Sequence, residues 1–101
     1  MRDGDGAAGK GGNLVDVTAT IRNERGLHAR AAAKFVKLAG SFDAEVTVSK
    51  GGQAVSGLSI MGLMMLAASQ GSNIHLSASG LEADAALQAL CDMIEAKFEE
   101  E

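Results

Sequence analysis

A histidine and an arginine stand two positions apart at the start of a predicted helix. Residues 26–32 read Gly-Leu-His-Ala-Arg-Ala-Ala. The first N–H groups of a helix lack carbonyl partners, and the aligned peptide dipoles add partial positive charge, so an anion is stabilised there. The same field disfavours a charged ring at His28 and keeps it nucleophilic, while Arg30 offers a permanently charged, forked donor to phosphoryl oxygens. The pair predicts a phosphate site, although the spacing alone also fits an ordinary capping or surface histidine.

The helix behind this pair is predicted from its apolar spacing. Gly26 and Gly40 bracket it as a turn and a C-terminal stop. Between them, small and large apolar residues recur at i, i+3, i+4 and i+7, at positions Ala32, Phe35, Val36 and Ala39.

A basic stripe is predicted on the same helix. Arg30, Lys34 and Lys37 recur at i, i+4 and i+7 in a chain whose net charge is −4. Such a stripe speeds docking onto acidic partner surfaces, and an ordinary solvated face is the alternative.

The rest of the chain alternates between strand and helix patterns. Strands are predicted at 15–21, 44–48, 53–56 and 74–78, with Gly51-Gly52 as a hairpin turn and His75 pointing away from the core. One helix is predicted from Ser59 to about Ser69, with Gly71 as the stop that follows it. Another helix is predicted in the last segment, where the apolar face consists of Leu87, Leu90, Cys91, Ile94 and Phe98. The residues after Phe98, Glu99-Glu100-Glu101, are expected to be solvated. The order β-α-β-β-α-β-α favours an α+β fold, with a four-stranded antiparallel sheet and the helices on one face.

Composition limits the class of protein. The chain has 101 residues, of which 47% are hydrophobic, and this is enough for the core of one domain, predicted at residues 14–101. The glycine-rich residues 1–13 are expected to form a flexible tail. The negative charge and three aromatics argue against nucleic-acid binding. No apolar stretch approaches the about 20 residues of a spanning helix, so we expect a cytoplasmic protein without membrane insertion. Cys91 is expected to be a core residue, and no cofactor or metal site is indicated.

Two separate motifs resemble the HPr family, the histidine phosphocarriers of the phosphoenolpyruvate-dependent phosphotransferase system. They are the segment 26–32 and the segment 58–66, Leu-Ser-Ile-Met-Gly-Leu-Met-Met-Leu. The resemblance extends over roughly residues 14–98 and implies an open-faced β-sandwich. It also implies that His28 accepts a phosphoryl group on its δ nitrogen from enzyme I and donates it to a histidine of an enzyme IIA component, while Arg30 stabilises the phosphoimidazole. Such a carrier is expected to be a monomer and not an independent catalyst.

The second motif predicts a regulatory and partner-binding surface. Ser59 is a predicted N-cap, and in the resembling family this position is the serine phosphorylated by HPr kinase/phosphorylase in bacteria that have one. The apolar run is longer than one core-facing stripe needs, so some of its residues are expected to face solvent. Leu63 and Leu66 are expected in the core. By resemblance, an exposed patch used by several partners is expected at Ile60, Met61 and Met64.

Three positions depart from the common family pattern and concern partner preference. Ala31 stands where proline is frequent, Leu58 replaces a frequent lysine, and Arg25 adds positive charge near the predicted phosphate. The changes at Ala31 and Leu58 favour slightly a nitrogen-related, regulatory branch over a sugar-uptake branch. A regulatory binding module, acting through Ser59 and the apolar patch without phosphoryl relay, is the alternative, and the presence of both His28 and Arg30 argues against it.

Overall fold

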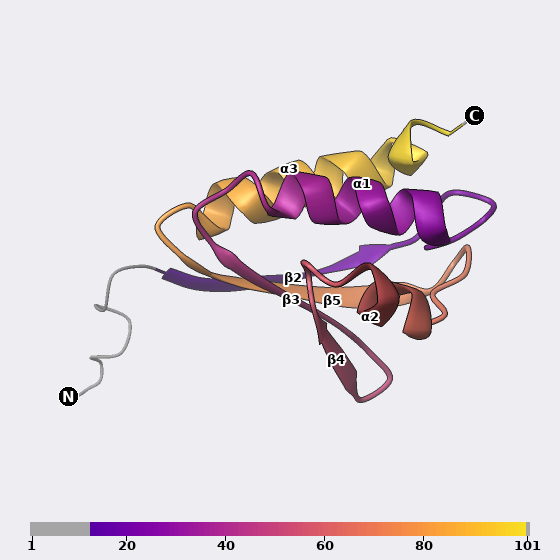
Figure 1. Cartoon of the computed structure of the whole chain (residues 1–101), viewed down its shortest axis with the longest axis horizontal. Coiled ribbons are helices and arrows are strands. Elements are labelled where there is room, and N and C mark those ends of the chain that lie inside the picture. Colours follow the sequence, from indigo (N-terminus) through magenta and orange to yellow (C-terminus); the bar gives the residue numbers. More distant parts are fainter. Residues whose placement is uncertain (1–12, 101) are drawn as a thin grey trace.

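Four strands and three α-helices make up the computed structural model, which describes residues 13–100 (Figure 1). The strands form one antiparallel sheet in the order β2-β5-β3-β4. Asn13 already belongs to the first strand, and the tail predicted for residues 1–13 otherwise lies outside the described residues. The elements are β2 (Asn13–Thr20), α1 (Ala29–Ala39), β3 (Glu45–Lys50), β4 (Gln53–Ser56), α2 (Ile60–Met65), β5 (Asn73–Gly80), α3 (Ala83–Glu95) and the short 3-10 turn η2 (Lys97–Glu99).

One face of the sheet is buried and the other faces solvent. In the central strand β5, Ile74, Leu76 and Ala78 are buried, whereas His75 between them is exposed. Helices α1 and α3 lie side by side over the buried face, and α2 packs against α1 and β4 (Figure 1). The predicted α+β open-faced sandwich and the outward position of His75 are therefore confirmed.

The turn between β3 and β4 follows its short-range sequence pattern. Gly51 and Gly52 have φ values of 56° and 88°, and they join Lys50 to Gln53 as a two-residue hairpin. Both conformations are left-handed, which glycine adopts without steric cost. The hairpin and the limits of β4 were predicted correctly.

The amphipathic helix α1 also follows its sequence pattern. It begins after His28 and ends at Ala39, with Gly40 as its C-cap. Its buried residues are Ala31, Ala32, Phe35 and Ala39, whereas Val36 of the predicted face is half-buried. Small alanines on this face let the helix approach its neighbours α2 and α3, while Phe35 is fully buried in the core.

Helix α2 is shorter than predicted, ending at Met65 rather than near Ser69. Ala67 has a φ of 52°, a left-handed conformation that no helix can continue through. The next residue, Ala68, is buried, and its carbonyl accepts a hydrogen bond of 2.9 Å from the Leu27 N–H. The chain leaves the helix early because this contact to the loop before α1 satisfies its backbone and buries Ala68.

Helix α3 also stops earlier than its apolar face predicted. It ends at Glu95, and the φ values of Lys97, Phe98 and Glu99 are 58°, 55° and 63°. Phe98 is nevertheless fully buried, so its place in the core arises from a chain reversal and not from helical spacing. The Lys34 ammonium anchors the reversed segment by donating a 2.7 Å hydrogen bond to the Phe98 carbonyl.

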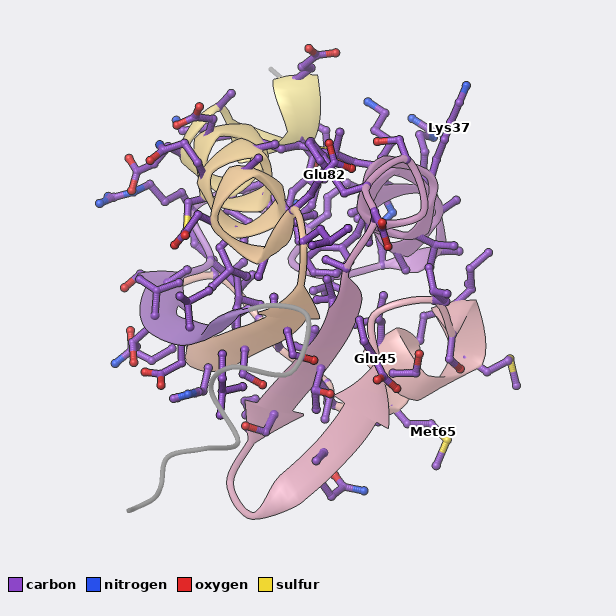
Figure 2. All side chains as sticks on the ribbon, turned by 90° about the vertical axis from the view of Figure 1, so that its left-hand side faces the viewer. Lys37, Glu45, Met65 and Glu82 are labelled. Carbon is purple, nitrogen blue, oxygen red and sulfur yellow. The ribbon has the colours of Figure 1, made fainter. Side chains whose placement is uncertain are left out.

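The start of α3 is tied to the segment before β3. The Glu82 carboxylate accepts a 2.6 Å hydrogen bond from the Asp43 N–H, and the Glu82 N–H donates to the Asp43 carbonyl at 2.9 Å. Figure 2 shows Glu82 between the two helices, near the end of the sheet. These paired bonds join the N-terminus of α3 to the segment before β3.

Among the described residues, no helix has the length and apolar character needed to cross a bilayer.

Gly26 should tolerate a side chain less well than Gly51, although both have a positive φ. A Cβ at Gly26 would lie 2.5 Å from the Ala68 carbonyl oxygen, whereas a Cβ at Gly51 would meet nothing within 4 Å. We expect Gly51→Ala to lower the free energy of unfolding by about 1 kcal/mol through its backbone conformation alone, and Gly26→Ala to lower it by at least about 1 kcal/mol more. Urea unfolding of both variants measures the difference. Equal losses would contradict the close approach of these two loops.

Candidate active site

His28 occupies the N-cap position of α1. Its backbone is extended, with φ −81° and ψ −179°, and its carbonyl accepts a 2.8 Å hydrogen bond from the Ala32 N–H. The side chain makes no capping hydrogen bond, and no acidic residue lies in the first turn. The N–H groups at this helix end therefore keep the capacity to stabilise an anion.

A tight loop delivers His28 to this position. The Gly26 N–H donates to the Asn23 carbonyl at 3.1 Å, and the His28 N–H donates to the Gly26 carbonyl at 2.9 Å. Gly26 has a φ of 69° and is buried against Ala68. The sequence predicted the turn at Gly26, but it carried no sign of the partner loop at Ala68.

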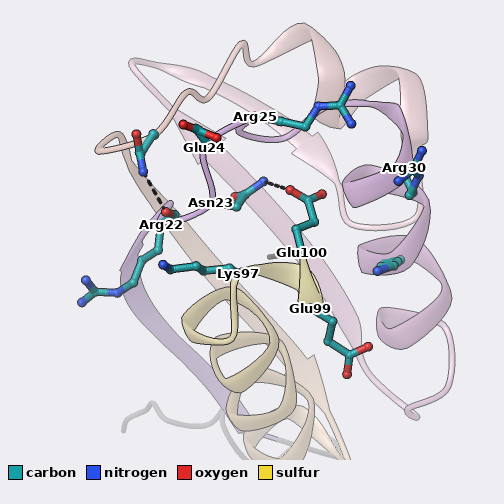
Figure 3. Close-up of a pocket in the computed structure, with 10 residues that line it drawn as sticks. Arg22, Asn23, Glu24, Arg25, Arg30, Lys97, Glu99 and Glu100 are labelled. Carbon is teal, nitrogen blue, oxygen red and sulfur yellow. Dashed lines mark hydrogen bonds between the residues drawn. The ribbon is translucent and has the colours of Figure 1, made fainter.

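Glu100 contacts His28 directly, which the sequence reasoning missed. The Nε2 atom of His28 lies 2.5 Å from Oε2 of Glu100, and the two side chains are 23% and 18% exposed. The other oxygen, Oε1, accepts a 3.0 Å hydrogen bond from the Asn23 amide (Figure 3). The same amide donates to the Gly26 carbonyl at 2.8 Å. The prediction that Glu100 is solvated is therefore wrong, because the reversal at Phe98 turns its carboxylate inward.

The Glu100 carboxylate is stabilised in its charged form. Partial burial, the largest single effect, acts to raise its pKa, but the hydrogen bonds from His28 and Asn23 and the charges of His28 and Arg25 together outweigh burial. The net result is that the pKa of the Glu100 carboxyl lies below its ordinary value. The site therefore holds a carboxylate at neutral pH.

Cationic side chains surround this carboxylate. A hollow of about 560 Å³ contains Glu100 and is lined by polar and charged residues of four segments (Figure 3). A smaller hollow of about 230 Å³ contains His28, and Arg25 lines both. Arg25 and Arg30 are exposed, so both can reach an anion at the helix end. The lining residues of the larger hollow are Arg22, Asn23, Glu24, Arg25, Arg30, Lys34, Gln70, Lys97, Glu99 and Glu100.

The predicted basic stripe on α1 is divided in the structure. Lys34 is half-buried and bonded to the Phe98 carbonyl, whereas Arg30 and Lys37 are exposed. Figure 2 shows Lys37 extending outward from α1. Lys34 therefore anchors the C-terminal segment, and the charges available to a partner on this helix are Arg30 and Lys37.

The second predicted surface lies on α2. Ser59 is the N-cap, and its Oγ accepts a 2.9 Å hydrogen bond from the Gly62 N–H. Leu63 and Leu66 are buried, as predicted. The three residues of the expected patch are exposed, and Leu58 and Met65 enlarge it; Figure 2 shows Met65 projecting from the molecule. The exposed fractions are Leu58 59%, Ile60 39%, Met61 70%, Met64 40% and Met65 65%.

Two other chemistries have little support in the described residues. No group of three or more His, Cys, Asp or Glu side chains could hold a metal ion in this part of the chain. Cys91 is half-buried, and burial, followed by the charges of Asp92 and Glu95, raises the pKa of its thiol. A raised pKa disfavours the nucleophilic thiolate.

The fold and the site define a small α+β protein that presents one histidine, with cations beside it, at an accessible helix N-terminus. A family model described as "PTS HPr component phosphorylation site" matches residues 15–96. The chain therefore belongs to the HPr family, the phosphocarriers of the phosphotransferase system.

Individual relatives agree with this assignment. The chain is 49% identical over 81 residues to phosphocarrier protein NPr of Shewanella violacea, a match that covers 80% of this chain and 89% of the relative. It is 50% identical over 82 residues to phosphocarrier protein HPr of Pseudomonas aeruginosa, covering 80% and 91%. A crystal structure of HPr from Thermoanaerobacter tengcongensis superposes with a TM-score of 0.82 at 47% identity, covering 86% of this chain and 98% of that chain.

Replacing Asn23 by alanine should raise the pKa of Glu100 and destabilise the protein at neutral pH. The variant loses the amide bonds to Glu100 and to the Gly26 carbonyl, which costs about 1–3 kcal/mol. A carboxyl whose folded pKa is depressed stabilises the protein above its unfolded pKa, and this contribution disappears as the pH falls through the folded pKa. The part of the loss that comes from Glu100 should therefore shrink in acid.

Carboxyl carbon NMR titration and urea unfolding at pH 7 and pH 3 test this expectation. Asn73→Ala is the matched control, because Asn73, at the start of β5, accepts a side-chain hydrogen bond from Thr20 at an exposed site. An unchanged Glu100 titration in Asn23→Ala would contradict the described contact.

Proposed function

We propose that His28 carries the phosphoryl group, which it accepts on Nδ1 from phosphorylated enzyme I and passes to a histidine of an enzyme IIA component. The main support is the position of its ring at the N-terminus of α1. The side chain does not cap the helix, and the hydrogen bond to Glu100 engages Nε2 and not Nδ1. The ring is also partly accessible, as a carrier used by two partners requires.

Arg30 is proposed to hold the phosphoryl oxygens. It lies two residues after His28, is exposed, and carries a charge that does not depend on pH near neutrality. Arg25 lines the hollow that contains His28 and supplies a second charge from the preceding loop. Two exposed cations and a helix end stabilise a phosphoryl group without enclosing it, so that it can leave again.

The other histidine, His75, is a poor candidate for the same role. It lies in the middle of β5 on the open face of the sheet, with its side chain 47% exposed. Its Nε2 is 3.7 Å from the Asp16 carboxylate, whose charge repels a phosphoryl donor. This contrast makes His75 a suitable control.

His28→Ala should abolish phosphate acceptance, and His75→Ala should leave it unchanged. Each protein is incubated with phosphoenolpyruvate and a cognate enzyme I, and acid-labile, base-stable phosphate is followed by phosphorus NMR and intact mass. Binding of each variant to enzyme I is measured in parallel. Label on His28→Ala would contradict the proposal. Absence of label on the unmodified protein, with enzyme I binding retained, would instead favour a regulatory binding module without phosphoryl relay.

The exposed apolar patch on α2 is proposed as the surface that enzyme I and enzyme IIA contact in turn. Ile60, Met61 and Met64 offer adaptable apolar area, and Arg30 and Lys37 add positive charge on the neighbouring helix α1. The identities of 49% to an NPr and 50% to an HPr are nearly equal, so the proposal includes both a sugar-uptake and a nitrogen-related acceptor. Transfer assays with purified enzyme IIA of each type separate the two branches.

Ser59 is proposed as a regulatory phosphorylation site for an HPr kinase/phosphorylase. Its hydroxyl caps α2, is half-buried, and stands directly before the exposed Ile60 and Met61. A phosphate on this oxygen would place negative charge at the edge of the apolar patch and oppose the docking of an acidic partner surface.

Ser59→Asp should slow phosphate acceptance from enzyme I by about tenfold while leaving the fold intact, because about 1–1.5 kcal/mol of docking energy is lost to charge repulsion. Ser49→Asp is the control, since it adds the same charge on β3, at a residue that pairs with His75 of β5 and Ala54 of β4 and lies outside α2. Initial rates of labelling at limiting enzyme I measure the effect. Equal rates for the two variants would remove Ser59 from the docking surface.

A further inference from the structure

We infer that Glu100 is a positioning residue for phosphoryl transfer at His28: its carboxylate accepts a hydrogen bond from the Nε2–H group, leaves the free lone pair of the neutral ring on Nδ1, and balances the ring charge after phosphorylation. The inference rests on the proposed role of His28 as the phosphoryl acceptor. It adds a residue that the sequence placed in a solvated end of the chain.

The contact between the two side chains has the geometry of a charge-assisted hydrogen bond. Nε2 and Oε2 are 2.5 Å apart, and both side chains are more than three-quarters buried. Only one nitrogen of a neutral imidazole carries a proton, and a carboxylate can accept a hydrogen bond but cannot donate one. A carboxylate at Nε2 therefore selects the tautomer in which Nδ1 is the nucleophile.

The fold holds Glu100 in place from two sides. On one side, Phe98 is fully buried two residues earlier, and the Lys34 ammonium binds its carbonyl at 2.7 Å. On the other side, the Asn23 amide donates to Oε1 at 3.0 Å. Asn23 is 1% exposed, so this donor belongs to the core of the loop before α1. The carboxylate is thus oriented by the protein and not by the end of a free chain.

The transfer balances without moving a proton. Nδ1 attacks phosphorus, the bond between phosphorus and the donor nitrogen breaks, and that bond's electron pair stays with the donor ring. The His28 ring then bears a positive charge with its Nε2 proton still bonded to Glu100. In the second transfer the acceptor nitrogen attacks phosphorus, and the pair of the breaking bond returns to Nδ1. Because the leaving ring keeps its Nε2 proton, it departs as neutral imidazole and not as an anion.

Charged groups from every neighbouring segment act on this pair. The loop before α1 contributes Arg22, Glu24 and Arg25, and α1 contributes Arg30 and Lys34. The C-terminal turn contributes Lys97, whereas the carboxylate of Glu99 next to it is directed away from Glu100 (Figure 3). The cations oppose a proton on the phosphorylated ring, and Glu100 is the carboxylate hydrogen-bonded to it. Loss of that carboxylate should therefore lower the pH at which the phosphorylated ring gives up its Nε2 proton.

The test compares Glu100→Ala with Glu99→Ala, which removes the same charge one residue earlier. Glu99 is exposed, and Figure 3 shows its carboxylate directed away from Asn23 and Glu100. Glu100→Gln is a second variant, which removes the charge but keeps an oxygen that can accept a hydrogen bond from the Nε2–H group. Phosphorylated protein is prepared with phosphoenolpyruvate and enzyme I, and the rate of donation to enzyme IIA is measured from pH 6 to pH 10. Proton–nitrogen NMR of the unphosphorylated proteins locates the ring proton.

We expect the alkaline limb of the donation profile to move down by about one pH unit in Glu100→Ala and Glu100→Gln, so that rates on this limb fall about tenfold. Glu99→Ala should keep the profile of the unmodified protein. The slowly exchanging Nε2 proton should be seen in the unmodified protein and in Glu99→Ala, and lost in Glu100→Ala.

An unchanged profile in Glu100→Ala, with His28 still labelled, would overturn the role of Glu100 and leave the proposed function standing. A profile that moves equally in Glu99→Ala would also overturn it, because the effect would then be one of general charge. Failure of the unmodified protein to accept phosphate would reject both proposals together.

Discussion

The packing of Gly26 against the Ala68 carbonyl fixes where α1 begins, and the position of His28 depends on it. The loop before α1 and the loop after α2 meet at this point, with the Leu27 N–H donating to Ala68 at 2.9 Å. A glycine is needed because a Cβ would overlap the carbonyl and because φ is 69°. The same contact ends α2 early, so it also sets the distance between the histidine and the apolar patch.

A second constraint comes from the reversal of the chain after α3. Left-handed backbone at three consecutive residues without glycine is unfavourable, and it persists here because Phe98 is buried and Lys34 binds its carbonyl. The reversal brings Glu100 to His28 across 72 positions of sequence. The site is therefore assembled from the loop before α1, the helix itself and the C-terminal turn. None of these segments orients the imidazole ring alone.

The sequence predicted those features that depend on local periodicity or on a single motif. Strand alternation and the Gly51-Gly52 turn specified the sheet, and the segment 26–32 placed His28 and Arg30 at a helix start. The length of α2 and the end of α3 could not be read in this way, because tertiary contacts of Ala68 and Phe98 override helix propensity there.

The contacts of Glu100 were missed for a related reason. The run of three glutamates is typical of a solvated end, and nothing in its composition reveals that the preceding residue is a core residue reached by left-handed backbone. The useful signal was Phe98 itself, since a large aromatic side chain beside three carboxylates has to be buried somewhere. Hydrophobic spacing placed that ring on the last helix. The prediction therefore contained no chain reversal, and without the reversal Glu100 cannot be placed beside His28.

The most direct measurement is the nitrogen-15 and phosphorus-31 spectrum of the phosphorylated protein with labelled histidine. The account predicts that phosphorus is bonded to Nδ1 of His28 and that Nε2 of the same ring still carries its proton. Phosphorus on Nε2, or on His75, would contradict it, because the hydrogen bond to Glu100 would then not direct the chemistry at this site.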